Sequence, residues 1–157
     1  MELVQLVQCL SKFLAFIVIF FSCLVYSNET LDVYPPTTFV NATELYCLAQ
    51  NIYFESRGES KIGQIAVAHV TLNRVRDPRF PKNICAVVKQ PYQFSWVHTI
   101  PSYKNIKISP AAKELALEIL LNKHKDPTAG ALFFHNKTIK PFKRTVIATI
   151  GNHTFYR

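Results

Sequence analysis

The sequence has no CxxC motif and no closely spaced pair of cysteine and histidine, although it contains four Cys and five His among 157 residues. Structural zinc sites usually need such short ligand spacings, so no metal site is expected. Internal repeats and low-complexity segments are also absent. With 49% hydrophobic residues, the sequence instead indicates an ordinary globular core of a size that fits one compact domain.

Acidic residues are scarce, with 10 Asp and Glu against 18 Lys and Arg and a formal net charge of +8. A charge of this size predicts an anionic partner, unless the basic surface serves only solubility. In the cytoplasm that partner would be nucleic acid, whereas outside it the abundant anions are cell-wall polymers and lipid headgroups. The charge alone does not choose between them, so the choice depends on whether the chain is exported.

The longest apolar run, residues 13–26, is too short for the roughly 20 residues that cross a bilayer core. Lys12 precedes it and a polar stretch follows, which is typical of a signal peptide. We expect cleavage after Ser27, with an uncleaved signal anchor in the inner membrane as the alternative. Either reading predicts an exported protein of the periplasm or cell envelope, with no nucleic-acid partner. Residues 28–40 then form a linker and residues 41–157 the domain.

Removal of residues 1–27 leaves two cysteines, Cys47 and Cys85. In an oxidising compartment this pair predicts a disulfide that closes a loop of about 38 residues. Two buried free thiols are the alternative.

Hydrophobic periodicity predicts helices first and strands last. The first helix begins at Asn41 or Thr43, where Asn41 and Glu44 have the spacing of a capping box, and it ends near Gly58. Further helices are expected over residues 60–76, 83–89 and 109–124, and strands over residues 131–134, 145–150 and 153–156. This order predicts an α+β domain with about three antiparallel strands and a cleft between its two parts.

Glu55 lies one turn beyond Leu48 and Ile52 on the apolar stripe of the first helix. Burial and the negative helix C-terminus both favour a neutral carboxyl, so the pKa should rise toward that of a general acid. The alternative is a structural carboxylate paired with Arg57 or Arg74. Glu59 follows Gly58 and is read as an acidic residue at the start of the second helix or as a partner of an Arg.

Several blocks of the sequence resemble SleB-like spore-cortex-lytic and cell-wall hydrolases. They include Asn51 to Glu59, Gly63-Gln64, Asn73-Arg74-Val75, Asp77 to Pro81, Gln93 to Trp96, Phe134-His135-Asn136 and Ile150 to His153, in the order of the family. The resemblance covers about residues 44–157 and departs from the family at Ser56 and Tyr92. It implies a lysozyme-like lytic transglycosylase that cleaves peptidoglycan between N-acetylmuramic acid and N-acetylglucosamine, with Glu55 as the acid and without a cofactor.

This chemistry fits the scarcity of acids. A two-carboxylate glycosidase needs a second acid across the sugar, and only Glu59 and Asp126 lack an evident structural or solvated role. A transglycosylase needs one carboxylate, although Asp126 in its loop stays open as a second acid.

Further residues are expected to bind the glycan. Amide, hydroxyl and aromatic groups suit N-acetyl groups and sugar rings, and the candidates are Tyr53, Gln93, Phe94, Ser95, Trp96, His135, Asn136 and Tyr156. For Phe94 and Trp96 the alternative is packing in the core. For His135, Asn136 and Tyr156 the alternative is a structural role.

Two other functions compete with this one. An N-acetylmuramoyl-L-alanine amidase would normally need zinc, for which the five histidines offer no close ligand pair. A non-catalytic protein that binds the wall or is tethered to the membrane would have no need for Glu55 on an apolar stripe.

Overall fold

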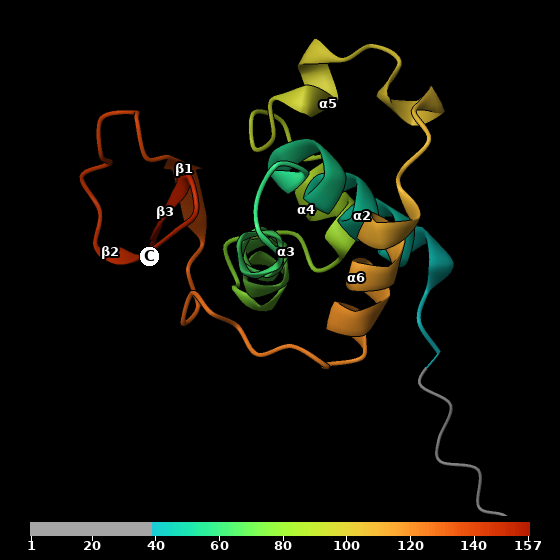
Figure 1. Cartoon of the computed structure of the whole chain (residues 1–157), viewed down its shortest axis with the longest axis horizontal. Coiled ribbons are helices and arrows are strands. Elements are labelled where there is room, and N and C mark those ends of the chain that lie inside the picture. The colour runs from blue at the N-terminus through green and yellow to red at the C-terminus, as the bar shows by residue number, and fades with distance from the viewer. Residues whose placement is uncertain (1–38) are drawn as a thin grey trace, which may run out of the picture. The chain divides into compact units, whose positions relative to one another are not determined.

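The computed structural model describes residues 39–157, which form a helical part followed by a small sheet (Figure 1). The expected signal peptide or anchor and nearly all of the expected linker lie outside these residues. The helices are α2 (Ala42–Ser56), α3 (Lys61–Arg76), α4 (Ile84–Val88), α5 (Trp96–Thr99), the 3-10 helix η1 (Tyr103–Asn105) and α6 (Pro110–Leu120), and the strands are β1 (Phe133–Asn136), β2 (Val146–Ile150) and β3 (His153–Tyr156). The predicted α+β class is confirmed. Within residues 39–157, no helix combines the length and apolar character that a membrane span needs.

Helix α2 begins as expected, but its capping box is only half formed. The Asn41 side chain accepts hydrogen bonds from the backbone N–H groups of Thr43 and Glu44. The Glu44 carboxylate does not return to Asn41; it accepts from the N–H groups of Ile84 and Cys85 instead. It therefore caps α4, where free N–H groups attract a negative charge. This contact ties α4 to the start of α2.

Helix α3 is the buried helix that its apolar sequence predicts. It lies between the other helices and the sheet (Figure 1). Ile65, Ala68 and Leu72 belong to the core shared with the helices, whereas Val67 and Val70 belong to the core shared with the sheet. Both sides of α3 are thus covered, which is why the helix has no polar face.

The structure joins Cys47 of α2 and Cys85 of α4 in a disulfide, with 5.2 Å between their Cα atoms. The predicted pairing is therefore the one that the fold forms. The bridge holds α4 against the helix that carries Glu55.

Some element boundaries differ from the predicted ones. Helix α6 ends at Leu120 rather than His124, because Asn122 has a left-handed backbone (φ 57°), a common way to end a helix. Strand β1 begins at Phe133 rather than Ala131. Helices α5 and η1 were not predicted. They have only four and three residues, too few for a helical periodicity to show in the sequence.

The sheet has the strand order β1-β3-β2, and all its pairs are antiparallel. The predicted hairpin connects β2 and β3 through Gly151 and Asn152, and Gly151 has φ +59°. Glu59, between α2 and α3, accepts hydrogen bonds from the backbone N–H and the side-chain amide of Asn152, both at 3.0 Å. Its carboxylate thus links the helices to the hairpin turn.

We expect Gly151→Ala to lower the free energy of unfolding by about 2 kcal/mol. Alanine at residue 151 would have to adopt a left-handed backbone. Its methyl group would also overlap the Glu59 carboxylate and displace the hydrogen bonds of Glu59 with Asn152. Urea unfolding measures the effect. Gly58→Ala is the matched control, because a methyl group there meets nothing within 4 Å. Equal stability of the two variants would contradict this account of the turn.

Candidate active site

Glu55 lies in the last turn of α2 and is half-buried. Burial raises its pKa from 4.5 to about 7, and the positive charge of Arg74 opposes this rise. No ion pair joins Glu55 to Arg57 or Arg74 in the described part of the chain. Arg57 lies over the Tyr53 ring instead, 5.2 Å from its centroid. The structural ion pair considered from the sequence is therefore not formed, and the carboxyl can hold a proton near neutral pH.

Arg74 of α3 is buried, and its positive charge lowers the pKa of Glu55. Its Nε donates a hydrogen bond to the Leu132 carbonyl at 2.7 Å. Its guanidinium lies over the rings of Phe80, Phe94 and Phe133, at 5.4, 5.2 and 5.7 Å from their centroids. These contacts hold the cation independently of Glu55. From the sequence, Arg74 was expected as part of a family block or as an ion-pair partner of Glu55, and its burial could have been predicted because it continues the buried line of Val67 and Val70 along α3.

The helix end that carries Glu55 is fixed from two further sides. One turn earlier, the Asn51 side-chain amide donates a hydrogen bond to Thr71 Oγ1 of α3 at 2.9 Å. Next to Glu55, Phe54 stacks on Trp96 with 4.5 Å between ring centroids. Ser56, a departure from the family pattern, donates its hydroxyl to the Ile52 carbonyl. The acid thus sits on a rigid element, which a reacting group requires.

The segment expected to form a groove wall divides into buried and accessible residues. Phe94 and Trp96 are 2% and 4% exposed and belong to the helical core. Core packing, the alternative kept for these two, therefore describes their placement. Ser95 is exposed and Gln93 is half-buried, so their polar groups can reach solvent.

The expected residues of the sheet also differ in their access to solvent. Tyr156 is fully buried, and its hydroxyl donates to His135 Nε2 at 2.8 Å, while His135 Nδ1 donates to the Asn136 carbonyl at 2.7 Å. These two bonds fix the orientation of the His135 ring. Asn136 is exposed, but its side-chain oxygen accepts from the backbone and hydroxyl of Thr138. The pair His135 and Tyr156 is thus ordered, with only the histidine half-exposed.

Both candidates for a second acid have structural partners. Asp126 accepts hydrogen bonds from the Thr128 backbone and hydroxyl, the Gly130 N–H and the Asn73 side chain, all at 2.7 or 2.8 Å. Burial raises the pKa of Asp126, but these donors lower it more. Burial likewise raises the pKa of Glu59, and its bonds to Asn152 outweigh that effect. Both groups are therefore stable as carboxylates with a structural role.

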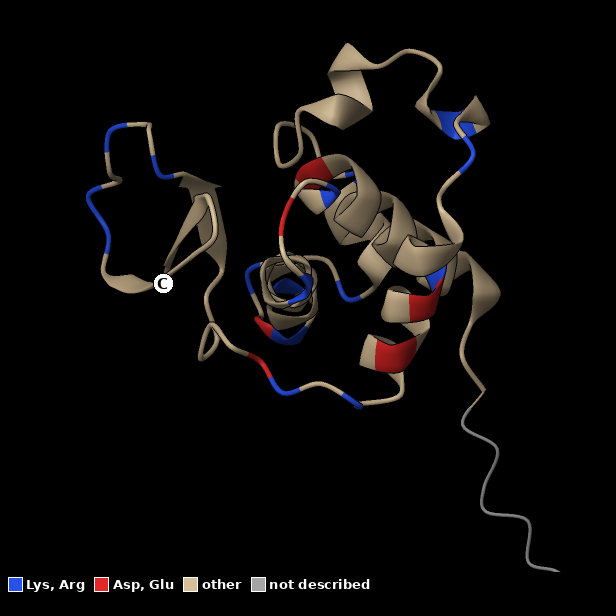
Figure 2. Ribbon diagram, in the orientation of Figure 1, with Lys and Arg blue, Asp and Glu red and all other residues tan. Residues whose placement is uncertain are grey.

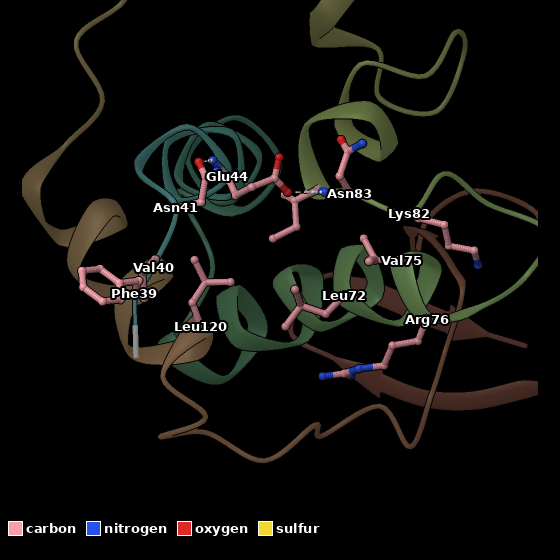
Figure 3. Close-up of a pocket in the computed structure, with 11 residues that line it drawn as sticks. Phe39, Val40, Asn41, Glu44, Leu72, Val75, Arg76, Lys82, Asn83 and Leu120 are labelled. Carbon is pink, nitrogen blue, oxygen red and sulfur yellow. Dashed lines mark hydrogen bonds between the residues drawn. The ribbon is translucent and has the colours of Figure 1, made fainter. Parts of the chain in front are cut away.

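A large pocket of about 740 Å³ lies at the opposite end of α2 from Glu55 (Figure 3). Its walls include Phe39, Glu44, Leu72, Arg76 and Leu120. None of the residues predicted to bind glycan lines it, and Glu44 is already engaged with α4. Among residues 39–157, no three His, Cys, Asp or Glu side chains are grouped closely enough to hold a metal ion.

The raised pKa of Glu55 makes the stability of the fold depend on pH. Between pH 4.5 and about 7 the folded protein keeps a proton that the unfolded chain has lost, so the stability contributed by this group falls as the pH rises through that window. Glutamine cannot ionise and avoids the loss. We therefore compare the free energy of unfolding of Glu55→Gln with that of the parent. This difference should favour the variant by about 3 kcal/mol more at about pH 8 than at about pH 4. Urea unfolding of both proteins at the two pH values measures this difference in stability. If the difference were the same at both pH values, the raised pKa of Glu55 would be contradicted.

Comparisons with known proteins agree with this architecture. The profile of the Cell Wall Hydrolase family matches residues 58–156, a range that begins just after Glu55. The chain is 34% identical over 116 residues to a spore cortex-lytic enzyme of Halalkalibacterium halodurans and 33% identical over 124 residues to one of Bacillus subtilis. These matches cover 71% and 76% of the chain but only 34% and 39% of the relatives, so the chain spans little more than a third of their length.

Two solved structures cover the domain more fully. The catalytic domain of the Bacillus cereus SleB protein superposes with a TM-score of 0.67 at 31% identity, over 76% of this chain and 94% of that domain. The catalytic domain of the germination-specific lytic transglycosylase SleB from Bacillus anthracis gives 0.66 at 32% identity, over 78% and 100%. They confirm the lysozyme-like α+β fold that the resemblance implied. With this fold and the match over residues 58–156, the chain belongs to the Cell Wall Hydrolase family.

Proposed function

We propose that the protein cleaves the glycan strands of peptidoglycan between N-acetylmuramic acid and N-acetylglucosamine, as a lytic transglycosylase with Glu55 as its only catalytic carboxyl group. The observation that carries the proposal is the half-buried Glu55, whose pKa lies at about 7 on a helix end fixed by core contacts. The names of the similar proteins, spore cortex-lytic enzyme and lytic transglycosylase, support the substrate and the reaction.

The proposed reaction uses the same carboxyl group twice. Glu55 first donates its proton to the glycosidic oxygen, so that the bond from muramic acid C1 to that oxygen breaks and N-acetylglucosamine leaves with a free hydroxyl. The Glu55 carboxylate then takes the proton of the muramoyl 6-hydroxyl, and that oxygen bonds to C1. The product is a 1,6-anhydro ring, and the acid is regenerated without water as a nucleophile.

The occupied carboxylates Glu59 and Asp126 favour this reaction over a two-carboxylate hydrolysis. An inverting glycosidase needs a second carboxylate free to activate water, and a retaining one needs it free to attack the sugar. Both candidates are instead engaged in structural hydrogen bonds, Asp126 on both oxygens with Asn73, Thr128 and Gly130, and Glu59 with Asn152. Arg74 contributes a fixed positive charge, which stabilises Glu55 after it has given up its proton.

The residues proposed to bind the glycan are the polar ones of the expected set that are half-buried or exposed. They are Tyr53, Gln93, Ser95, His135 and Asn136. The buried residues of the original set, Phe94, Trp96 and Tyr156, are proposed to support them from inside the fold. The reaction requires no cofactor. Its substrate places the protein in the cell envelope, on the outer side of the cytoplasmic membrane.

Mass spectrometry of digested peptidoglycan tests the reaction. Lytic transglycosylation is expected to give muropeptides with anhydro-muramoyl ends, which are lighter by one water than reducing ends. Reducing ends alone would show a hydrolase with a second acid. Freed stem peptides, together with loss of activity on chelation, would show the zinc amidase.

A further inference from the structure

The segment that connects β1 to β2 concentrates positive charge at one edge of the molecule. Figure 2 shows blue segments along this connection, at the edge of the fold away from α6. We call residues 137–145 the basic loop; its cations are Lys137, Lys140, Lys143 and Arg144. From residue 133 to residue 157 the sequence contains no Asp or Glu. Helix α6, which contains Glu114 and Glu118, has red segments in its ribbon instead (Figure 2).

None of the cations of the basic loop forms an ion pair in the described part of the chain. The charge of Lys137 nevertheless acts on the Glu59 carboxylate and lowers its pKa. Lys137 donates to the Gly151 carbonyl at 3.2 Å, and Arg144 lies 3.9 Å from the centroid of the Phe133 ring. Lys140 and Lys143 are exposed and make no hydrogen bond within residues 39–157. Their full charge is therefore available to a partner.

Large apolar side chains alternate with these cations. Ile139 is 55% exposed, Phe142 is 44% exposed, and Val146, at the start of β2, is 53% exposed. Three such residues lie within eight positions of the sequence, whereas single exposed apolar residues are common on any protein. A surface that offers both cations and apolar side chains matches the interface of an anionic membrane, where headgroups lie above an apolar layer.

The basic loop is held in place, so it presents a formed surface. The Lys137 N–H donates to the Asn152 carbonyl at 2.8 Å, and the Arg157 N–H donates to the Thr145 carbonyl at 3.1 Å. In the middle, Phe142 packs against His135 and Tyr156, with ring centroids 4.6 and 5.3 Å apart. The Ile139 N–H donates to the Asn136 carbonyl at 2.9 Å, so the backbone of Ile139 is held while its side chain stays exposed.

We propose that the basic loop docks on the surface of an anionic lipid bilayer, with Lys140 and Lys143 among the headgroups and Ile139 and Val146 in the apolar layer beneath. A hydrated polyanion would satisfy the lysines but would offer Ile139 and Val146 no apolar phase. This function goes beyond glycan cleavage and does not depend on Glu55. It would keep the enzyme at the boundary between the membrane and the wall.

A tryptophan in the loop tests the apolar part of the proposal. The single native Trp96 is 4% exposed, so changes in emission of full-length Ile139→Trp report on residue 139. We expect a blue shift and protection from acrylamide with vesicles of phosphatidylcholine and phosphatidylglycerol in equal parts, but not with phosphatidylcholine alone. Ile62→Trp, at a position 49% exposed on α3, is the control that should not respond.

Charge reversal tests the electrostatic part. Lys140→Glu/Lys143→Glu should weaken binding to the anionic vesicles by at least about ten-fold. Lys104→Glu/Lys107→Glu changes the net charge equally at exposed positions outside the loop and should have a much smaller effect. The N-terminal apolar run is common to all variants. Equal weakening by the two pairs would overturn the proposal, and so would an unshifted emission of Ile139→Trp together with equally tight binding to poly-glutamate.

Discussion

Glu55→Gln is expected to lower the rate of glycan cleavage by at least about a thousand-fold. General acid catalysis alone contributes roughly a hundred- to ten-thousand-fold, and in the proposed reaction the same group also serves as the base. Glutamine keeps the shape of the side chain and avoids the cost of a buried charge, so the fold should persist. Turbidity loss of purified peptidoglycan measures the rate, and cosedimentation with insoluble peptidoglycan shows whether binding remains.

Glu59→Gln is the matched control for this variant, because it neutralises a carboxylate four positions away in the same motif. Glu59 holds Asn152 of the hairpin turn, so its loss should lower stability while cleavage continues at a similar rate. If Glu55→Gln stayed active, the proposed mechanism would be wrong. Loss of cleavage in Glu59→Gln, measured on protein that is still folded, would instead give Glu59 a part in the reaction.

Cys47→Ala/Cys85→Ala is expected to lower the free energy of unfolding by about 4 kcal/mol. The disulfide spans 38 positions. Closing a loop of this length lowers the conformational entropy of the unfolded chain, which corresponds to about 4 kcal/mol at 25 °C. The expected loss is a large part of the roughly 5 to 15 kcal/mol that stabilises a typical domain. Urea unfolding at constant pH measures it.

Reduction of the parent protein provides the control for these substitutions. The reduced parent should lose a similar amount of stability without any change of side chain, and the double variant should not respond to reductant. A loss below about 1 kcal/mol would mean that the packing of α4 on α2, together with the Glu44 cap, holds the two helices without the bridge.

Several features of the protein follow from short stretches of its sequence. Asn41 and Ser109 start helices, because their side chains accept hydrogen bonds from N–H groups two or three positions away, and Pro110 suits the first helical position. Gly151 permits the left-handed backbone of the hairpin turn. The apolar stripe of α2 places Glu55 in a half-buried position, as its spacing from Leu48 and Ile52 predicts. The spacing of the last two cysteines, however, showed only that a bridge was feasible.

The partners of the charged and aromatic residues could not be predicted in this way. Glu44 has the spacing of a capping box but binds α4, 40 positions away, and Glu59 binds Asn152, 93 positions away. Arg74 is fixed by the Leu132 carbonyl, 58 positions away, and Trp96 belongs to the core although its motif suggested a groove wall.

The sequence by itself thus determined the order of helices and strands, the helix starts and the buried acid, because capping, turn formation and periodicity act over a few residues. Only the tertiary structure decided that Glu59 and Asp126 accept structural hydrogen bonds while Glu55 accepts none from residues 39–157, and which aromatic rings reach solvent. The physical reason is that desolvation and hydrogen bonding at these sites depend on groups that only the folded chain brings together.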